Sequence, residues 1–241
     1  MSMTEHKTWF TALSDALDEG QLSGVFQLAT YDKPASIPRV RTHILRAFLT
    51  PSIHPTIPLL LSTTDIRSSK ITQIASADST HVEAVFWRMA TMEQFRIAGP
   101  VYIVPSPSYS GDGYPTVPQP GQNPIFDALR EVDGVDWERT RFDTFNALSP
   151  GMRASWCTPV PGSPMKAYDE GLAWPQTVPR LGEAKTEDDE RNQATAFGNF
   201  ALLIIEPLQV DYLELGTERQ RRTIYTREPG HLGFEQRMVV P

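Results

Sequence analysis

The order of apolar segments along the chain predicts a mainly β protein, built on an antiparallel barrel with flanking helices. Short runs rich in β-branched and aromatic residues, typical of strands, occur at 24–31, 39–49, 58–64, 82–87 and 95–104, and again at 199–206, 210–215, 222–227 and 234–239. Strands do not alternate with helices, which disfavours a doubly wound parallel sheet. A closed antiparallel barrel with helices at its ends accommodates this order best.

Residues 39–49 form the strand whose alternation bears most directly on function. Val40, Thr42 and Ile44 fall on one face of this strand. Successive strand residues point to opposite faces, so Arg39, Arg41 and His43 share the other face. One face of this strand is therefore expected to be basic.

Two helices are expected beside the early strands. Apolar residues from Trp9 onward recur at helical spacing over residues 7–20, and Gly20 is a suitable stop. Residues 68–75 predict a short helix with Ser68 at its N-cap.

The middle of the chain departs from the strand pattern. Residues 105–121 are rich in Pro, Ser, Gly and Tyr and predict a loop, and residues 125–147 predict a helical region broken at Gly134. Residues 159–190 are rich in Pro and Gly and then acidic, which predicts an extended or mobile segment. We therefore expect one domain over residues 1–241, with a helical and Pro/Gly/acidic excursion at about 105–195 and late strands that complete the sheet.

Charge narrows the classes of ligand. The chain carries 22 Lys and Arg against 29 Asp and Glu, a net charge of -7, which argues against a nucleic-acid partner. Five cations nevertheless fall within about thirty residues, offset only by Asp65, and such a local cluster favours a small anionic ligand. These cations are Arg39, Arg41, Arg46, Arg67 and Lys70.

Other features point to a reducing, cytoplasmic compartment and no membrane association. No run of about 18 apolar residues is present, and the N-terminus lacks the pattern of a secretion signal. The single cysteine, Cys157, has no intrachain disulfide partner and is expected to be a small buried packing residue. The five histidines are dispersed, without metal-ligand spacing, and no metal is expected.

The basic cluster has the residue types that a phosphate monoester requires. Arg41 offers a bidentate fork, and Lys70 offers a point charge in the first turn of the expected helix. Ser68 and Ser69 add hydroxyl and backbone donors at the start of the same helix, and Thr64 stands at the end of the preceding strand. Each residue alone is typical of a protein surface, but their combination predicts a phosphate cradle.

A planar hydrogen-bonding ring could bind beside this cradle. Gln94 both donates and accepts hydrogen bonds. Backbone groups of residues 42–45 would border such a ring, and Thr63 and Thr64 would reach ribityl or ring oxygens. The sequence contains no nucleophile elbow, phosphate-binding P-loop or Rossmann glycine pattern, and it identifies no catalytic acid or base.

These segments resemble those of the pyridoxamine 5'-phosphate oxidases. Arg41-Thr-His-Ile-Leu-Arg46 is similar to their Arg-x-Val-Leu-Leu-Lys strand, and Thr64-Asp-Ile-Arg-Ser-Ser-Lys70 to their Thr-Asn-x-x-Ser-Arg-Lys segment. Gln94-Phe-Arg-Ile-Ala-Gly99 resembles their Gln-Val-x-x-x-Gly strand, and Arg222 with Tyr225 resembles their Arg-x-x-Tyr run. The combination is most similar to the Alr4036-type FMN-binding subfamily.

The resemblance implies a split antiparallel β-barrel, FMN as cofactor, and a homodimer with the site between subunits. It further implies that Arg67 replaces a missing phosphate cation, that Ser68 belongs to the cradle, and that Ser163 reaches the flavin from the partner subunit. The remaining FMN contacts that it implies are Arg41, Thr42, His43, Ile44, Arg46, Thr63, Thr64, Ser69, Lys70, Gln94 and Arg222.

Departures from the family pattern bear on the substrate. Glu218 and Gln220 stand where the oxidases carry the Arg and His that serve the vitamin substrate, and Leu213 stands where they carry a Trp. A Glu would repel a phosphorylated substrate. The sequence therefore predicts an FMN-dependent oxidoreductase, with hydride chemistry at the flavin N5, acting on a substrate other than pyridoxamine phosphate. A non-catalytic FMN carrier or sensor, and a split barrel that has lost FMN, are the alternatives.

Overall fold

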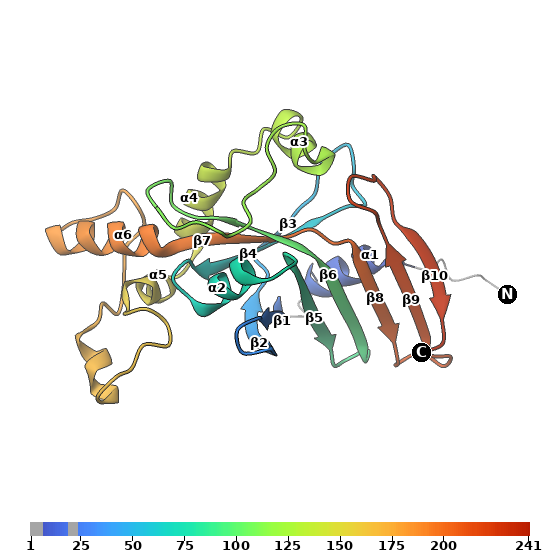
Figure 1. Ribbon diagram of the computed structural model, residues 1–241, viewed down its shortest axis with the longest axis horizontal. Coiled ribbons are helices and arrows are strands. Elements are labelled where there is room, and N and C mark those ends of the chain that lie inside the picture. Colours follow the sequence, from blue (N-terminus) through green and yellow to red (C-terminus); the bar gives the residue numbers. More distant parts are fainter. Residues whose placement is uncertain (1–6, 19–23) are drawn as a thin grey trace.

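The structure is a computed structural model that describes residues 7–18 and 24–241, and its strands form one antiparallel sheet (Figure 1). Every pairing between its strands is antiparallel. The strands are β1 (Val25–Asp32), β2 (Ile37–Ile44), β3 (Ala47–Leu49), β4 (Leu59–Asp65), β5 (His81–Arg88), β6 (Glu93–Val104), β7 (Phe200–Ile205), β8 (Gln209–Glu214), β9 (Arg221–Thr226) and β10 (Glu235–Val239).

The strands close into a barrel with one interruption. Pairings run from β2 through β1, β5, β6, β7 and β4 to β3, and the chain itself links β3 back to β2. No ladder joins β2 to β4 in the described residues, so the barrel is split at this point. Strands β8, β9 and β10 extend the sheet outward from β6. The expected split antiparallel barrel is therefore confirmed.

The barrel interior holds the main hydrophobic core. β6 alternates buried and half-buried residues along its whole length, and the buried set includes Phe95 and Ile97. Helix α1 (Trp9–Asp18) covers one side of this core by inserting Trp9 and Leu13. Helix α2 (Ser69–Ser76) packs against β1 and contributes apolar residues to the same core.

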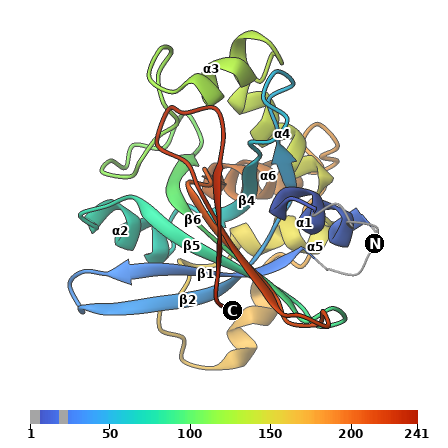
Figure 2. The ribbon, with the colours of Figure 1, turned by 90° about the vertical axis from the view of Figure 1, so that its right-hand side faces the viewer.

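A second core lies on the other side of β4 and β7. All six residues of β7 are buried, because one face meets the barrel interior and the other meets a layer of helices. Figure 2 shows α3 at the top of the molecule, α4 below it, and the β1–β2 hairpin further down. The helices after β6 are α3 (Pro124–Glu131), α4 (Trp137–Ala147), α5 (Pro150–Ala154) and α6 (Glu187–Asn199), with short 3₁₀ turns η1 (Ser155–Cys157) and η2 (Tyr168–Ala173).

The strand expected over 39–49 is two strands in the structure. The backbone N–H of Leu45 donates to the carbonyl of Gly24, and that of Arg46 donates to the carbonyl of Leu61. The chain therefore changes partners between these two residues, leaving β1 and joining β4. This change of partner creates the split in the barrel. The expected helix over 7–20 is α1, but its expected stop, Gly20, lies outside the described residues.

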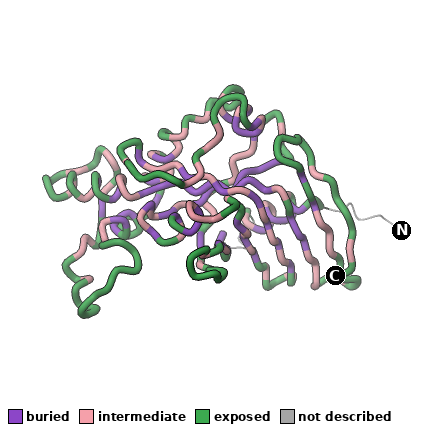
Figure 3. Tube along the Cα trace, viewed as in Figure 1, coloured by how far each residue is buried: buried purple, intermediate pink, exposed green. Residues whose placement is uncertain are grey.

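The expectation of an extended or mobile acidic segment up to residue 190 is wrong for its last residues. Glu187 to Glu190 form the first turn of α6, where carboxylates interact favourably with the helix dipole. Thr186 caps this helix by accepting a hydrogen bond from the backbone of Asp189. The preceding loop is irregular except for η2, and Figure 3 shows that the loop between η1 and α6 is largely exposed.

The outer face of the sheet is partly exposed, above all on β1 and β2. Cross-strand partners share a face, so the chain of partners Thr42–Gln27–Val85–Arg96–Asp211 traces this outer face from β2 to β8. Its exposed apolar side chains are Val25, Tyr31, Val40, Ile44 and Trp87. No helix in the described part of the chain is long and apolar enough to cross a membrane.

Candidate functional site: a cationic cleft beside the split

A cleft of about 350 Å³ opens beside the split in the barrel. β2 and the end of β4 form two sides, Lys70 of α2 a third, and the α5–η1 segment a fourth. The predicted site residues that it brings together are Arg41, Thr42, His43, Ile44, Arg46, Thr63, Thr64 and Lys70; its other lining residues are Asp65, Met152, Ser155, Trp156 and Pro161.

The cations of the cleft are held by neutral oxygens. Arg41 donates to the carbonyl of Leu28, the hydroxyl of Thr30 and the side-chain oxygen of Gln73. Arg46 donates a long hydrogen bond of 3.4 Å to Thr63 Oγ1. No salt bridge neutralises Arg41 or Arg46 within the described residues. Burial lowers the pKa of both guanidinium groups, and Arg39 lowers that of Arg41 further.

Lys70 is the most perturbed cation of the cleft. Its ammonium donates to Thr64 Oγ1 and to Ser68 Oγ, each at 2.9 Å. Burial, together with a smaller effect of the nearby charge of Arg41, lowers the pKa of Lys70 to about 8, while the carboxylate of Asp65 acts in the opposite direction. A buried ammonium among other cations gains stability from an anion that enters the cleft.

His43 lies beneath these cations in its neutral form. Burial, followed by the charges of Lys70, Arg41 and Arg46, lowers the pKa of its imidazole to about 3. Its Nδ1 lies 3.1 Å from Ser62 Oγ, and that hydroxyl donates to the carbonyl of Ile44. The hydroxyl therefore accepts, which assigns the proton to Nδ1 of His43.

Gln73 and Thr30 contact a cation of the cleft, and the sequence did not reveal either of them. Gln73 Oε1 accepts from Arg41 at 2.6 Å and from Thr30 at 2.7 Å, and both polar side chains are buried. They hold the guanidinium of Arg41 from β1 and α2, although neither lines the cleft itself. The available signal was the spacing of Gln73, three residues after Lys70 and so on the same face of α2.

Arg67 lies close in sequence to the cradle but not in it. Its guanidinium forms a bidentate pair with Asp65, with Nε to Oδ1 at 3.0 Å and Nη2 to Oδ2 at 2.7 Å. It does not line the cleft. Arg67 was predicted to bind the phosphate, but its guanidinium binds the carboxylate of Asp65 instead.

The two serines at the start of α2 differ in position. Ser68 occupies the expected N-cap position, but its hydroxyl donates to the carbonyl of Asp65 and does not cap the helix. It contributes to the site through Lys70. Ser69 is exposed at the first position of α2 and does not line the cleft.

The predicted contacts Gln94, Arg222 and Ser163 lie away from the cleft of the same chain. Gln94 on β6 and Arg222 on β9 lie on the outer face of the sheet, joined in register through Leu213. Arg222 forms a bidentate pair with Asp211, at 3.0 and 2.8 Å. Ser163 is exposed in the loop that begins at the edge of the cleft.

The sequence and the fold both have known relatives. Residues 6–105 match the model of a family described as pyridoxamine 5'-phosphate oxidase, FMN-binding domain. The structure is similar to that of a pyridoxamine 5'-phosphate oxidase-related, FMN binding protein from Nostoc punctiforme PCC 73102, with 25% identity, a TM-score of 0.65 and 100% of both chains covered. No curated protein matches the sequence significantly.

A more distant structure shares the fold alone. PhzG from Burkholderia lata 383, solved in complex with tetrahydrophenazine-1-carboxylic acid, is 12% identical and has a TM-score of 0.55. The similarity covers 99% of this chain and 95% of PhzG. The fold is thus the split barrel of pyridoxamine 5'-phosphate oxidase-like proteins. Its first part, residues 6–105, matches the FMN-binding domain of that family, and this part supplies every cation of the cleft.

Proposed function

We propose that this protein is an FMN-binding flavoprotein whose cleft holds the FMN phosphate. The observation that carries the proposal is the set of half-buried cations, Arg41, Arg46 and Lys70, which have no salt-bridge partner within the described residues. Mutual repulsion and burial make this arrangement unfavourable in an empty cleft. A dianionic phosphate monoester supplies the missing charge and accepts charge-assisted hydrogen bonds.

The residues of the cleft fit this cofactor. Arg41 contributes the charge of a guanidinium that Thr30 and Gln73 hold in place. Lys70 contributes an ammonium held by Thr64 and Ser68. Thr42 and Ile44 are exposed on the β2 side of the cleft, where a ring system would lie against them. When bound, FMN supplies hydride or electron transfer at its ring, and the protein supplies orientation and electrostatics.

The proposed site is completed by a second copy of the chain. Gln94 and Arg222 lie on the same outer face as Thr42 but several strands away from it, so one chain does not bring them to its own cleft. That face also exposes Val40, at 64%, and Trp87, at 39%. Apolar side chains grouped on one face favour an association interface. A homodimer formed through this face would bring Gln94 and Arg222 of one protomer toward the cleft of its partner.

The reaction that we propose is an oxidoreduction of a substrate other than pyridoxamine phosphate. Glu218 and Gln220 are exposed near the start of β9. By the resemblance, the pyridoxamine 5'-phosphate oxidases carry their substrate-binding Arg and His at these two positions. A carboxylate at this position repels a phosphorylated substrate. Within the described residues, the carboxylate that lines the cleft is that of Asp65, and Arg67 binds it.

The test of this proposal is the visible absorption spectrum of protein incubated with FMN and then desalted. Retained flavin, with absorbance at about 450 nm, supports the flavoprotein. Loss of that band on anaerobic addition of a candidate donor would identify an oxidoreductase. Retained flavin that no donor bleaches would favour the carrier or sensor. A colourless protein would refute the proposal and leave a split barrel without flavin.

A further inference from the structure

The α5–η1 segment is a wall of the cleft that belongs to no motif described above. Met152 and Ser155 line the cleft and are exposed, whereas Trp156 lines it but is 5% exposed and packs into the second core. Pro161 ends this wall. The wall residues that face the cleft carry no charge.

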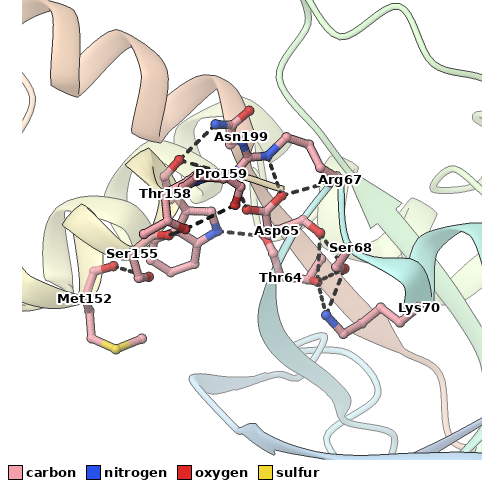
Figure 4. Close-up of polar contacts among 11 residues, drawn as sticks. Thr64, Asp65, Arg67, Ser68, Lys70, Met152, Ser155, Thr158, Pro159 and Asn199 are labelled. Atoms are coloured by element: carbon pink, nitrogen blue, oxygen red, sulfur yellow. Dashed lines mark hydrogen bonds and ion pairs between the residues drawn. The ribbon is translucent and has the colours of Figure 1, made fainter. Parts of the chain in front are cut away.

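A polar latch attaches this wall to the end of β4 (Figure 4). Arg67 Nη2 donates to the carbonyl of Thr158 at 3.1 Å and to that of Trp156 at 3.5 Å, while Asp65 holds the same guanidinium. The side chains of Arg67 and Asp65 are 22% and 10% exposed, so solvent screens this pair only partly. Charge-assisted hydrogen bonds to carbonyls in such a setting are stronger than neutral ones.

Two further hydrogen bonds hold the same turn. Trp156 Nε1 donates to the carbonyl of Thr64 at 3.2 Å, and Asn199 Nδ2 donates to the carbonyl of Trp156 at 2.8 Å. Thr64 also accepts from Lys70. Thr64 therefore holds both sides of the cleft. Its carbonyl accepts from Trp156 of the wall, and its hydroxyl accepts from the ammonium of Lys70.

We propose that the α5–η1 segment contacts the uncharged part of the bound flavin, with Met152 and Ser155 as its contact residues and Arg67 as the positioning residue. The inference rests on the proposed function, because it concerns the same cleft. The residues of the wall that line the cleft include no cation for the phosphate, since Arg153 of α5 is buried and does not line it. The Met152 thioether is suited to aromatic contact, and the Ser155 hydroxyl, which donates to the carbonyl of Met152 at 2.7 Å, keeps lone pairs for a ligand donor.

Riboflavin lacks the phosphate of FMN, so comparing the two flavins separates residues that contact the uncharged part of the flavin from residues that bind its phosphate. The dissociation constants of FMN and riboflavin are measured for the wild type, Asp65→Asn/Arg67→Ala and Lys70→Ala. The Asp65→Asn change removes the unpaired carboxylate that Arg67→Ala alone would leave in the cleft. Loss of the latch should weaken both flavins by the same factor, about tenfold. Lys70→Ala should weaken FMN and leave riboflavin unchanged. A latch variant that lost FMN affinity alone would show Arg67 to be a phosphate ligand and would overturn the proposal.

A second variant tests the contact residues without disturbing the latch. Met152→Ala/Ser155→Ala alters exposed side chains and should weaken FMN and riboflavin equally. Val160→Ala is the matched control, because Val160 is exposed in the loop that follows η1 and does not line the cleft, and this variant should bind both flavins as the wild type does. Unchanged riboflavin affinity in the double variant would refute the contact.

A flavin-independent measurement separates this inference from the proposed function. Amide hydrogen exchange of residues 150–161 is compared between wild-type and Arg67→Ala apoprotein. The latch predicts exchange about tenfold faster in the variant, confined to this segment. Unaltered exchange would overturn the latch. If the wild type bound neither flavin, the proposed function and the contact role would fail together, while the exchange result would still decide whether Arg67 positions the wall.

Discussion

The ammonium of Lys70 lies 2.9 Å from the hydroxyl oxygen of Thr64. Its other hydrogen-bond acceptor, Ser68, is also a hydroxyl. The arrangement is unfavourable for the empty protein, because neutral oxygens only partly replace the water that the ammonium loses. It is favourable once an anion enters. Stability and binding are therefore expected to respond to Lys70 in opposite directions.

Lys70→Met should stabilise the apoprotein and weaken FMN binding. The pKa of Lys70 is lowered from 10.5 to about 8, so between these values the unfolded chain binds the proton that the folded protein has lost. The group's contribution to stability accordingly rises with pH through this window. Urea unfolding at pH 7 should give the variant an advantage of roughly 1 to 3 kcal/mol, which shrinks toward pH 10. A variant less stable than the wild type at pH 7 would contradict this.

His43→Gln should remove part of the acid sensitivity of the fold. The pKa of His43 is lowered from 6.5 to about 3, so below pH 6.5 the unfolded chain takes up a proton that the folded protein excludes. Wild-type stability is therefore lost as pH falls from 6.5 toward 3. The variant should retain roughly 1 to 2 kcal/mol more stability at pH 5 than the wild type, relative to their difference at pH 8. Parallel stability curves for the two proteins would exclude this role.

Gly99→Ala should destabilise the barrel strongly. A Cβ at this position would overlap the carbonyl oxygen of Glu206, where the strand crosses from one part of the sheet to the other. Backbone atoms have little room to retreat, so we expect a cost of about 2 to 4 kcal/mol in thermal or urea unfolding. Gly198→Ala is the control, because an added Cβ there would have no described atom within 4 Å outside its own stretch of helix, and alanine has the higher helix propensity. Equal effects of the two substitutions would refute the crowding.

Val40→Glu should dissociate the proposed homodimer. Val40 is 64% exposed on the outer face of the sheet, and a carboxylate there would be desolvated in a face-to-face dimer. Sedimentation velocity should show a dimer for the wild type and a monomer for the variant. Val132→Glu, at a residue 54% exposed at the end of α3, should leave the dimer intact. A monomeric wild-type protein would contradict the shared site.

Strand content and the basic face of β2 could be predicted from the sequence because both depend on local alternation. Arg41 and Lys70 meet because β2 and α2 both flank β1, and their residue types indicate an anion. The split between β2 and β3 could not be predicted in the same way. The split depends on the acceptor of the Arg46 N–H, which is the carbonyl of Leu61 on β4, fifteen residues further along the chain.

The wall and the latch depend on contacts far apart in sequence. Trp156 and Thr64 are 92 residues apart, and no periodicity indicates that the indole donates to that carbonyl. Arg67 was assigned to phosphate by its residue type and place, but Asp65 competes for the same guanidinium from two residues away. The sequence shows that Arg67 is positively charged. Where its guanidinium points depends on the nearest carboxylate, which the sequence pattern does not reveal.

The most direct test of the central claim is the ratio of the riboflavin and FMN dissociation constants in the wild type and in Arg41→Ala/Lys70→Ala. The phosphate cradle predicts that the wild type prefers FMN by about a hundredfold or more, since two charge-assisted contacts are involved, and that the double variant has a ratio near one. Riboflavin should bind both proteins equally. A wild type that bound the two flavins with the same affinity would contradict the phosphate cradle.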